Sequence, residues 1–182
     1  MAKAGVDSPR DLDFGHRRLV GIVFTDIVRS TPQLYELHTG QWMRLLRAHW
    51  YQLRHLLSQF GGHLVDRTGD SLLATFPQAT DGLLFARAAV TDPGDERICL
   101  RAGVHWGYVT KDPIVGLVAG RAIHFADRVM SFAMEGGVCV SDDAKHQIDA
   151  ESPDSSRKIQ WTPHDDCELK GVPGFHRVWR IA

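Results

Sequence analysis

Two spacings of apolar residues in the first third of the chain predict two kinds of element. Residues 19–24 are a short apolar run rich in β-branched side chains, which predicts a buried strand that ends at Asp26. Over residues 41–60 the apolar positions recur mostly at intervals of three and four, which predicts an amphipathic helix ended by Gly61-Gly62. We therefore expect this helix to cover one face of a sheet.

The segments that follow predict the remaining elements. Ser30, Thr31 and Pro32 supply an N-cap and a proline for the first turn, so a helix is expected to begin there. Residues 63–76 read as a β-hairpin that turns at residues 68–70. The further expected elements are a helix, a strand, a helix, a strand, a polar loop and an edge hairpin, over residues 82–91, 98–107, 120–134, 137–141, 150–158 and 159–181.

This order of elements predicts an α+β fold built on a ferredoxin-like βαββαβ palm. We expect the palm to be complete at the strand that ends at Ser141, with additional C-terminal strands after it. The 182 residues of the chain suit one domain with a single core. We expect a flexible leader over residues 1–16 and a single catalytic domain over residues 17–182.

The composition of the chain indicates which kinds of partner and which cellular compartment to expect. The 21 basic and 22 acidic residues are interspersed and no basic run occurs, so nucleic acid is not an expected partner. Cys99, Cys139 and Cys167 form no CxxC pair, which indicates neither a disulfide framework nor a zinc knuckle. No stretch reaches the ~18 apolar residues of a membrane span, and no signal peptide is evident. These features predict a soluble cytoplasmic protein without a membrane partner.

Two aspartates stand where apolar strands end. Asp26 follows the first strand, and Asp70 lies in the turn of the hairpin. Carboxylates at neighbouring strand ends repel each other unless a cation lies between them, so the pair predicts divalent metal binding. The alternative for Asp26 is a helix-capping role.

Five stretches in order and spacing resemble the class III nucleotide cyclases, the family of adenylyl and guanylyl cyclase catalytic domains. The resemblance covers roughly residues 17–181. The turn Gly-Gly-(Asp/Glu)-Glu-Phe of diguanylate cyclases, which share the palm, does not occur. The five stretches are Val23–Thr31, Gly61–Phe76, Arg101–Gly107, Gly120–Val129 and Glu168–Val172.

The resemblance implies a reaction and a metal site. The reaction is cyclisation of a nucleoside triphosphate to a 3′,5′-cyclic nucleotide with release of pyrophosphate. It implies two divalent cations, Mn²⁺ or Mg²⁺, on Asp26, Asp70 and the carbonyl of Ile27. Backbone amides up to Thr31 precede a helix N-terminus and are suited to hold a triphosphate. The substrate-binding residues expected in this segment are Phe24, Ser30 and Thr31.

A second group of expected residues lies on the helix after Gly120. His124 and Arg128 are four apart and share one helix face. In the family this pair is an asparagine and an arginine that meet the ribose and the transition-state phosphate, so Arg128 matches and His124 departs. The alternatives are a surface ion pair for Arg128 and a packing histidine for His124. Lys170 matches a further family motif and is expected either to approach the triphosphate or to end a strand.

Two departures from the family pattern concern the base. Members that use ATP carry lysine four residues before the second metal aspartate and those that use GTP carry glutamate, whereas this chain has Asp66, followed by Arg67. The partner position falls near Leu117, whose apolar side chain cannot read a base by hydrogen bonding. Adenine is therefore not the expected base. We expect Asp66 or Arg67 to meet the edge of a pyrimidine, unless both are solvated hairpin residues.

Compact cyclases that make cyclic UMP or cyclic CMP in bacterial antiphage defence also depart from the purine pattern, and the chain is similar to them in size. The hypothesis is thus a UTP or CTP cyclase in antiphage defence. The alternatives are a purine cyclase and an inactive nucleotide-binding module. The resemblance further implies a homodimer with composite active sites, in which one chain supplies Asp26 and Asp70 and the other supplies His124 and Arg128.

Overall fold

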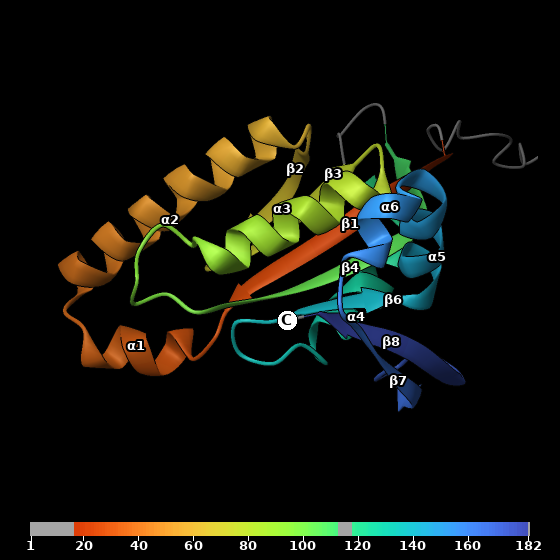
Figure 1. Cartoon of the computed structure of the whole chain (residues 1–182). Helices are drawn as coiled ribbons and strands as arrows, with labels where there is room; N and C mark the ends of the chain where they lie inside the picture. The colour runs from red at the N-terminus through yellow and green to blue at the C-terminus, as the bar shows by residue number, and fades with distance from the viewer. Residues whose placement is uncertain (1–16, 113–117, 182) are drawn as a thin grey trace, which may run out of the picture.

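The computed structural model describes residues 17–112 and 118–181. These residues form one mixed sheet with helices packed against it (Figure 1). The strands are β1 (Arg17–Ile27), β2 (His63–Thr68), β3 (Ser71–Phe76), β4 (Leu100–Lys111), β5 (Val118–Ala119), β6 (Val138–Ser141), β7 (Trp161–Glu168) and β8 (Phe175–Ile181). The helices are α1 (Ser30–Glu36), α2 (Thr39–Gln59), α3 (Ala79–Thr91), α4 (Arg121–Met130), α5 (Asp142–Glu151) and α6 (Pro153–Arg157). The leader expected over residues 1–16 lies outside the described residues.

The first four strands form a ferredoxin-like palm. They lie in the order β2-β3-β1-β4, and β1 pairs antiparallel with both β3 and β4. The α+β fold class is confirmed, but the prediction that the palm is complete only at Ser141 was wrong. After α3 the chain returns directly to the free edge of β1, so β4 already completes the palm.

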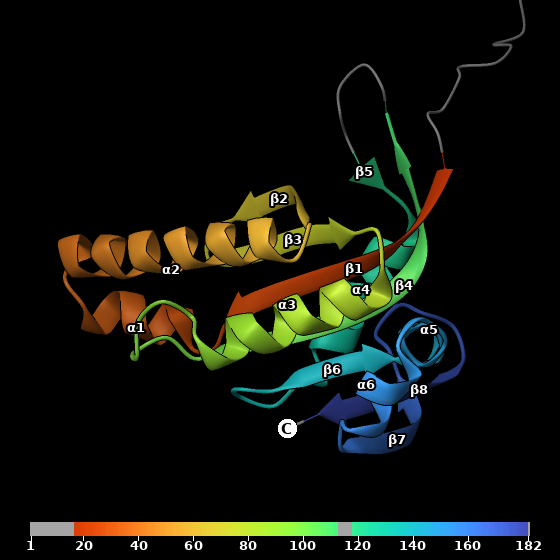
Figure 2. The ribbon, with the colours of Figure 1, turned by 45° about the horizontal axis from the view of Figure 1, so that its top comes forward.

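The later strands extend the sheet beyond the palm. β6 pairs in parallel with β4 over Ala102–Val104, β8 pairs antiparallel with β6, and β7 is the edge strand. The expected edge hairpin over residues 159–181 is therefore confirmed as β7 and β8. β5 pairs with β4 at Thr110 and Lys111, and Figure 2 shows this end of β4 projecting from the domain with β5.

α2 covers one face of the palm with α3, as its apolar periodicity predicts. Its inward side chains join those of α3, α5 and the strands in the main core. No helix in the described residues is long and apolar enough to cross a membrane. The buried residues of α2 are Trp42, Leu45, His49, Leu53, Leu56 and Leu57.

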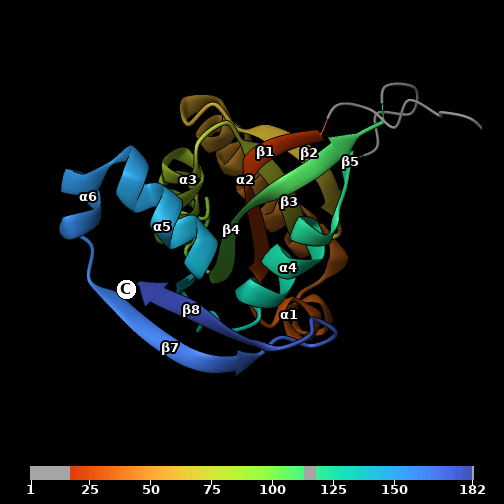
Figure 3. The same cartoon turned by 90° about the vertical axis from the view of Figure 1, so that its right-hand side faces the viewer.

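α4 lies on the opposite face of the palm (Figure 3). Ala126 of α4 packs with Ile22 and Val109 in a second core cluster. A Cβ added at Gly103 of β4 would lie 2.4 Å from the backbone nitrogen of Met130, so only glycine allows α4 to approach this closely. Gly103 thus fixes the distance between β4 and the helix that carries His124.

Two local expectations need correction. Residues 150–158 are not a loop, because α5 extends to Glu151 and α6 follows directly. α5 was missed because only Ala144 and Ile148 of it are buried, which leaves a weak apolar period. α1 begins at Ser30 itself, with Arg29 as N-cap in the left-handed conformation at φ 57°, so Ser30 is not the N-cap.

Glu151 links the end of α5 to the start of α3. Its carboxylate accepts hydrogen bonds from the backbone N–H groups of Ala79 and Thr80 at 3.0 and 2.8 Å, and from the Thr80 hydroxyl at 2.7 Å. A carboxylate at a helix N-terminus satisfies free N–H groups and favours the helix dipole. Burial acts to raise the pKa of Glu151, but hydrogen bonds from Thr80, Gln147 and Ala79 outweigh it, so this pKa lies below its ordinary value of 4.5.

Replacing Glu151 with alanine should lower the free energy of unfolding at pH 7 by about 1–3 kcal/mol, because three N–H and O–H donors lose their acceptor. Since the pKa of Glu151 is depressed in the folded chain, its contribution is present above the unfolded pKa and is lost as pH falls through the folded value. Urea unfolding of both proteins should therefore converge at low pH. The exposed Glu135, replaced in the same way, is the control, and an equal loss there would contradict the capping role.

Candidate active site

The structure places Asp26 and Asp70 at the same end of the palm. β1 and β3 pair with Thr25 opposite Leu72, so the end of β1 lies beside the β2–β3 turn. Ser71, which follows Asp70, donates its hydroxyl hydrogen to Oδ1 of Asp26 at 2.8 Å. Asp70 is therefore the chain neighbour of a residue that contacts Asp26.

Arg101 of β4 completes the surroundings of Asp26 on its other side. β4 pairs with β1 so that Arg101 lies opposite Asp26, and its Nη2 and Nε donate to Oδ2 of Asp26 at 2.7 and 3.2 Å. Sequence reasoning placed Arg101 in a family motif but gave it no role, because its contact with Asp26 depends on the register of two strands far apart in the chain.

Asp70 has a carboxylate oxygen that is buried and receives no hydrogen bond from the described part of the chain. Behind it in the core lies His49, which is 0% exposed and whose Nδ1 is 2.8 Å from the Pro93 carbonyl. Burial lowers the pKa of His49, and the nearby charge of Asp70 acts in the opposite direction. A buried carboxylate oxygen without a donor is costly unless a cation binds it, so this donor set fits a divalent cation.

A groove of about 870 Å³ lies beside these aspartates, between the β2–β3 hairpin and α4. Asp66 and His124, which are 58 positions apart in the chain, both line it, as does Phe24 of β1. The Asp66 carboxylate accepts from the backbone N–H of Arg67 at 2.7 Å and from the Thr68 hydroxyl at 3.4 Å, which fixes its direction. Ser71 also lines the groove and joins it to Asp26.

Arg67 lies on the other side of the hairpin from Asp66. Its guanidinium is 4.9 Å from the ring centre of Trp50 on α2, and it does not line the groove. A register shift between Leu64 and Asp66 turns both Val65 and Asp66 toward the groove, and the next residue then faces α2. The structure thus brings Asp66 together with His124 but does not bring Arg67 to them.

Arg128 and Lys170 are in contact. Nε of Arg128 donates to the Lys170 carbonyl at 3.0 Å, and Nη1 forms an ion pair with Asp127 at 2.8 Å. Asp127 itself lines the groove beside His124. Sequence reasoning missed Asp127, because adjacent helix residues face different directions and only the long arginine side chain reaches back to it.

Comparison with known proteins supplies the family. The family model described as the adenylate and guanylate cyclase catalytic domain matches residues 14–181. The chain belongs to this cyclase family.

Among curated relatives, an adenylate cyclase of Podospora anserina is 29% identical over 154 residues, covering 69% of this chain and 7% of that protein. An adenylate cyclase of Mycosarcoma maydis is also 29% identical, over 158 residues, covering 71% of this chain and 6% of that protein. The chain thus spans less than a tenth of the length of these relatives.

Solved cyclase domains share the fold. The guanylate cyclase domain of RhGC from Catenaria anguillulae, solved in complex with GTP, has a TM-score of 0.79 at 22% identity and covers 92% of this chain and 98% of that one. The non-canonical dimeric guanylyl cyclase domain of the RhoGC fusion protein from Blastocladiella emersonii has a TM-score of 0.76 at 20% identity and covers 92% of this chain and 98% of that one.

The remaining expected residues of the cyclase motifs are placed as follows. Ile27 is the last residue of β1, and Ser30 and Thr31 form the first turn of α1, so all three follow Asp26 at the same end of the palm. Leu117, expected near the base, lies outside the described residues. Neither Asp26 nor Asp70 lines the groove that holds Asp66 and His124, which leaves two separate sets of residues on one chain.

Adding Mn²⁺ should raise the melting temperature of the protein, because binding to the folded state alone contributes about 2.7 kcal/mol at a hundred times the dissociation constant. Asp70→Asn should remove most of this shift, since it removes the charge of the carboxylate with the free buried oxygen. Asp66→Asn in the same hairpin is the control and should keep it. An unchanged Mn²⁺ shift in Asp70→Asn would argue against the metal site.

Proposed function

We propose that the chain cyclises a nucleoside triphosphate to a 3′,5′-cyclic nucleotide and pyrophosphate. The observation that carries the proposal is the pair Asp26 and Asp70, with a free buried oxygen on Asp70, beside a groove lined by Asp66 and His124. In this reaction the ribose 3′-oxygen forms a bond to the α-phosphorus and loses its proton, while the bond from that phosphorus to the leaving pyrophosphate breaks.

Metal ions and cationic side chains would together stabilise the negative charge of the triphosphate and of the leaving pyrophosphate. Two divalent cations, Mn²⁺ or Mg²⁺, held by Asp26, Asp70 and the Ile27 carbonyl, would supply Lewis-acid activation of the 3′-hydroxyl and neutralise the leaving pyrophosphate. The planar guanidinium of Arg128 suits two-point contact with the phosphate undergoing attack. Arg101 stands at Asp26, where it can balance the charge of the triphosphate.

The other expected residues hold the substrate. The backbone of Ser30 and Thr31 lies after Asp26 and is suited to the triphosphate, together with the ammonium group of Lys170, whose backbone carbonyl contacts Arg128. His124 lines the groove and can donate a hydrogen bond to the ribose region, and Phe24 forms part of the groove wall.

Asp66 is the residue that we assign to the base. Its carboxylate only accepts hydrogen bonds, so it suits the N3–H of uracil or the N4 amino group of cytosine and offers no donor to N1 of adenine. We therefore propose UTP or CTP as substrate, and a cyclic pyrimidine nucleotide as a signal in antiphage defence. GTP is the second candidate, because guanine also presents N–H groups to an acid and a cyclase domain of similar fold binds GTP.

A nucleotide-binding module without turnover is the alternative to an enzyme. His124 stands where the family carries asparagine, and the donors of Arg128 are engaged by Asp127 and Lys170. This alternative requires nucleotide binding without release of pyrophosphate.

The proposal is tested by incubating the purified protein with Mn²⁺ and each of ATP, GTP, CTP and UTP, with product identification by mass spectrometry. A single cyclic pyrimidine nucleotide is expected, and Asp66→Asn should lower its rate because the acceptor charge is lost. Cyclic GMP would favour the second candidate. No product from any triphosphate, with binding retained, would favour the module without turnover. A strain carrying Asp70→Ala should lose any protection against phage.

We further propose a homodimer with composite sites. Asp26 and Asp70 lie outside the groove that Asp66 and His124 line, so one chain offers two different half-sites. A twofold dimer would join each metal half to the helix α4 of its partner.

Complementation distinguishes composite sites from a site within one chain. Asp70→Ala and Arg128→Ala should each be inactive alone. After mixing and subunit exchange, half of the dimers would be mixed and each would hold one intact site, so about a quarter of wild-type activity should return. The Asp70→Ala protein mixed with an Asp70→Ala/Arg128→Ala double variant is the control and should stay inactive. Failure of the first mixture, with subunit exchange shown by mass spectrometry, would contradict the composite site.

A further inference from the structure

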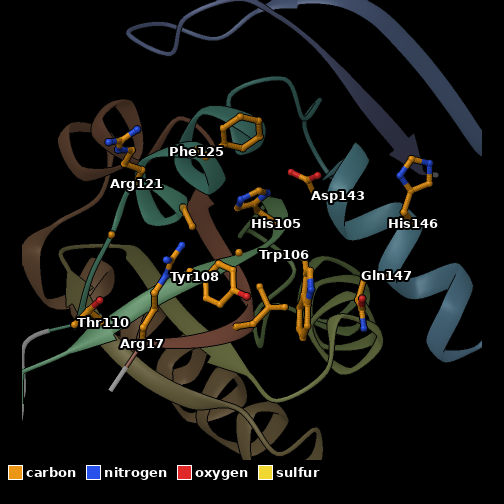
Figure 4. Close-up of a pocket in the computed structure, with 14 residues that line it drawn as sticks. Arg17, His105, Trp106, Tyr108, Thr110, Arg121, Phe125, Asp143, His146 and Gln147 are labelled. Atoms are coloured by element: carbon orange, nitrogen blue, oxygen red, sulfur yellow. The ribbon is translucent and has the colours of Figure 1, made fainter. Parts of the chain in front are cut away.

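A second cleft, of about 880 Å³, lies on the other side of α4 from the groove that Asp66 and His124 line (Figure 4). Its lining comes from β1, β4, and the N-terminal parts of α4 and α5, and among the described residues only Gly120 also lines the groove. Arg121 and Phe125 of α4 face this cleft, whereas His124 and Asp127 face the groove. One helix therefore separates the two spaces.

The cleft exists because β4 is longer than its neighbours on one edge. β1 pairs with one edge of β4 over Leu100–Thr110, while on the other edge β6 pairs with Ala102–Val104 and β5 with Thr110 and Lys111. Between these contacts no described strand lies beside His105–Val109. A free strand edge presents polar backbone groups, so this part of β4 offers hydrogen bonds to whatever enters the cleft.

The cleft carries cationic and aromatic side chains. The Arg17 guanidinium lies 3.9 Å from the ring centre of Tyr108, and neither Arg17 nor Arg121 forms an ion pair with a described carboxylate. Trp106 and Tyr108 stand on the same wall in Figure 4, and Asp143 is the one acid among the described lining residues. This chemistry suits an anion attached to a flat ring.

A buried histidine adds a directed donor. His105 is 5% exposed, packs on Phe125 with ring centres 4.5 Å apart, and lines the cleft. Burial lowers its pKa to about 4, so the ring is neutral at pH 7. The Ser141 hydroxyl oxygen accepts from the Ala144 N–H and lies 2.8 Å from Nδ1 of His105. When this hydroxyl donates to Nδ1, the hydrogen of the ring is on Nε2, which then serves as a donor.

We propose that this cleft is a regulatory site for a nucleoside monophosphate, open or 3′,5′-cyclic. The base would stack on the aromatic wall of Trp106 and Tyr108, and the phosphate would accept hydrogen bonds from Arg17 and Arg121. A volume of about 880 Å³ lies within the usual range for small-ligand sites. Since α4 forms a wall of both spaces, a phosphate held by Arg121 would act on the helix that carries His124. This last step rests on the proposed cyclase activity, whereas the binding itself does not.

The test is calorimetric titration of the full chain, without triphosphate, with the four nucleoside monophosphates and their 3′,5′-cyclic forms, and with inorganic phosphate as reference. At least one nucleotide should bind about tenfold or more tightly than phosphate. Arg17→Glu should weaken that binding about tenfold or more, because a charge-assisted contact is lost. Arg121→Glu should act in the same direction if Arg17→Glu does not fold.

Two control variants separate this cleft from other sites. Arg18→Glu makes the same change at the next exposed position of β1, which points to the other face of the strand and lines neither space, and it should leave binding unchanged. Asp70→Ala should also leave it unchanged, because Asp70 belongs to the metal half-site. If the chain cyclises triphosphates, the ligand should change kcat in the wild type and not in Arg17→Glu, whose basal activity should be normal.

The outcomes are distinct. Preference for the cyclic form identifies the product as ligand, and preference for the open form identifies a nucleotide from another source; both support the site. Absence of binding, binding no tighter than phosphate, or binding lost in Asp70→Ala but kept in Arg17→Glu would overturn it. So would loss of a dimer in Arg17→Glu with nucleotide binding intact, since the cleft would then be covered by a second copy. Absence of cyclase activity with binding intact would overturn only the proposed function.

Discussion

The pairing of β1 with β3 on one edge and with β4 on the other places Asp26 between Ser71 and Arg101. A shift of one residue in either pairing would turn the side chains of the shifted strand to the opposite face and separate Asp26 from its partner on that strand. Both the hairpin that carries Asp70 and the strand that carries Arg101 take their position from β1. The candidate metal site is thus a property of strand register, and the apolar residues of β1 that fill two cores hold that register.

α4 depends on the same sheet. Gly103 allows its backbone to lie against β4, and Ala126 fills the contact with a small side chain. From this position α4 presents His124 to one space and Phe125 to another. Because a packed helix moves as a unit, a displacement of α4 caused by contacts on one side also moves the side chains on its other side.

Local patterns in the sequence were enough for part of this arrangement. The period of α2 and the turn at Asp70 depend on neighbours in the chain, and both were predicted. The contact of Arg101 with Asp26 depends on register across 75 positions, which no local pattern contains. Adjacent strand residues alternate between faces, so Asp66 and Arg67 point in opposite directions, but which of them faces the groove follows from a bulge that depends on packing against β3. α5 was missed because most of its surface faces solvent.

The ion pair of Asp26 with Arg101 has a consequence for the proposed cation site. Arg101 already balances one of the two carboxylates at this end of the sheet, so the chain itself offsets part of the repulsion that a cation would otherwise relieve. With this partner for Asp26, folding would depend less on a cation than in small metallodomains, whose folding free energy is their binding free energy. Changes in cation concentration would then switch the proposed catalytic activity reversibly without unfolding the protein. A metal-depleted chain would stay folded and regain activity when cations return.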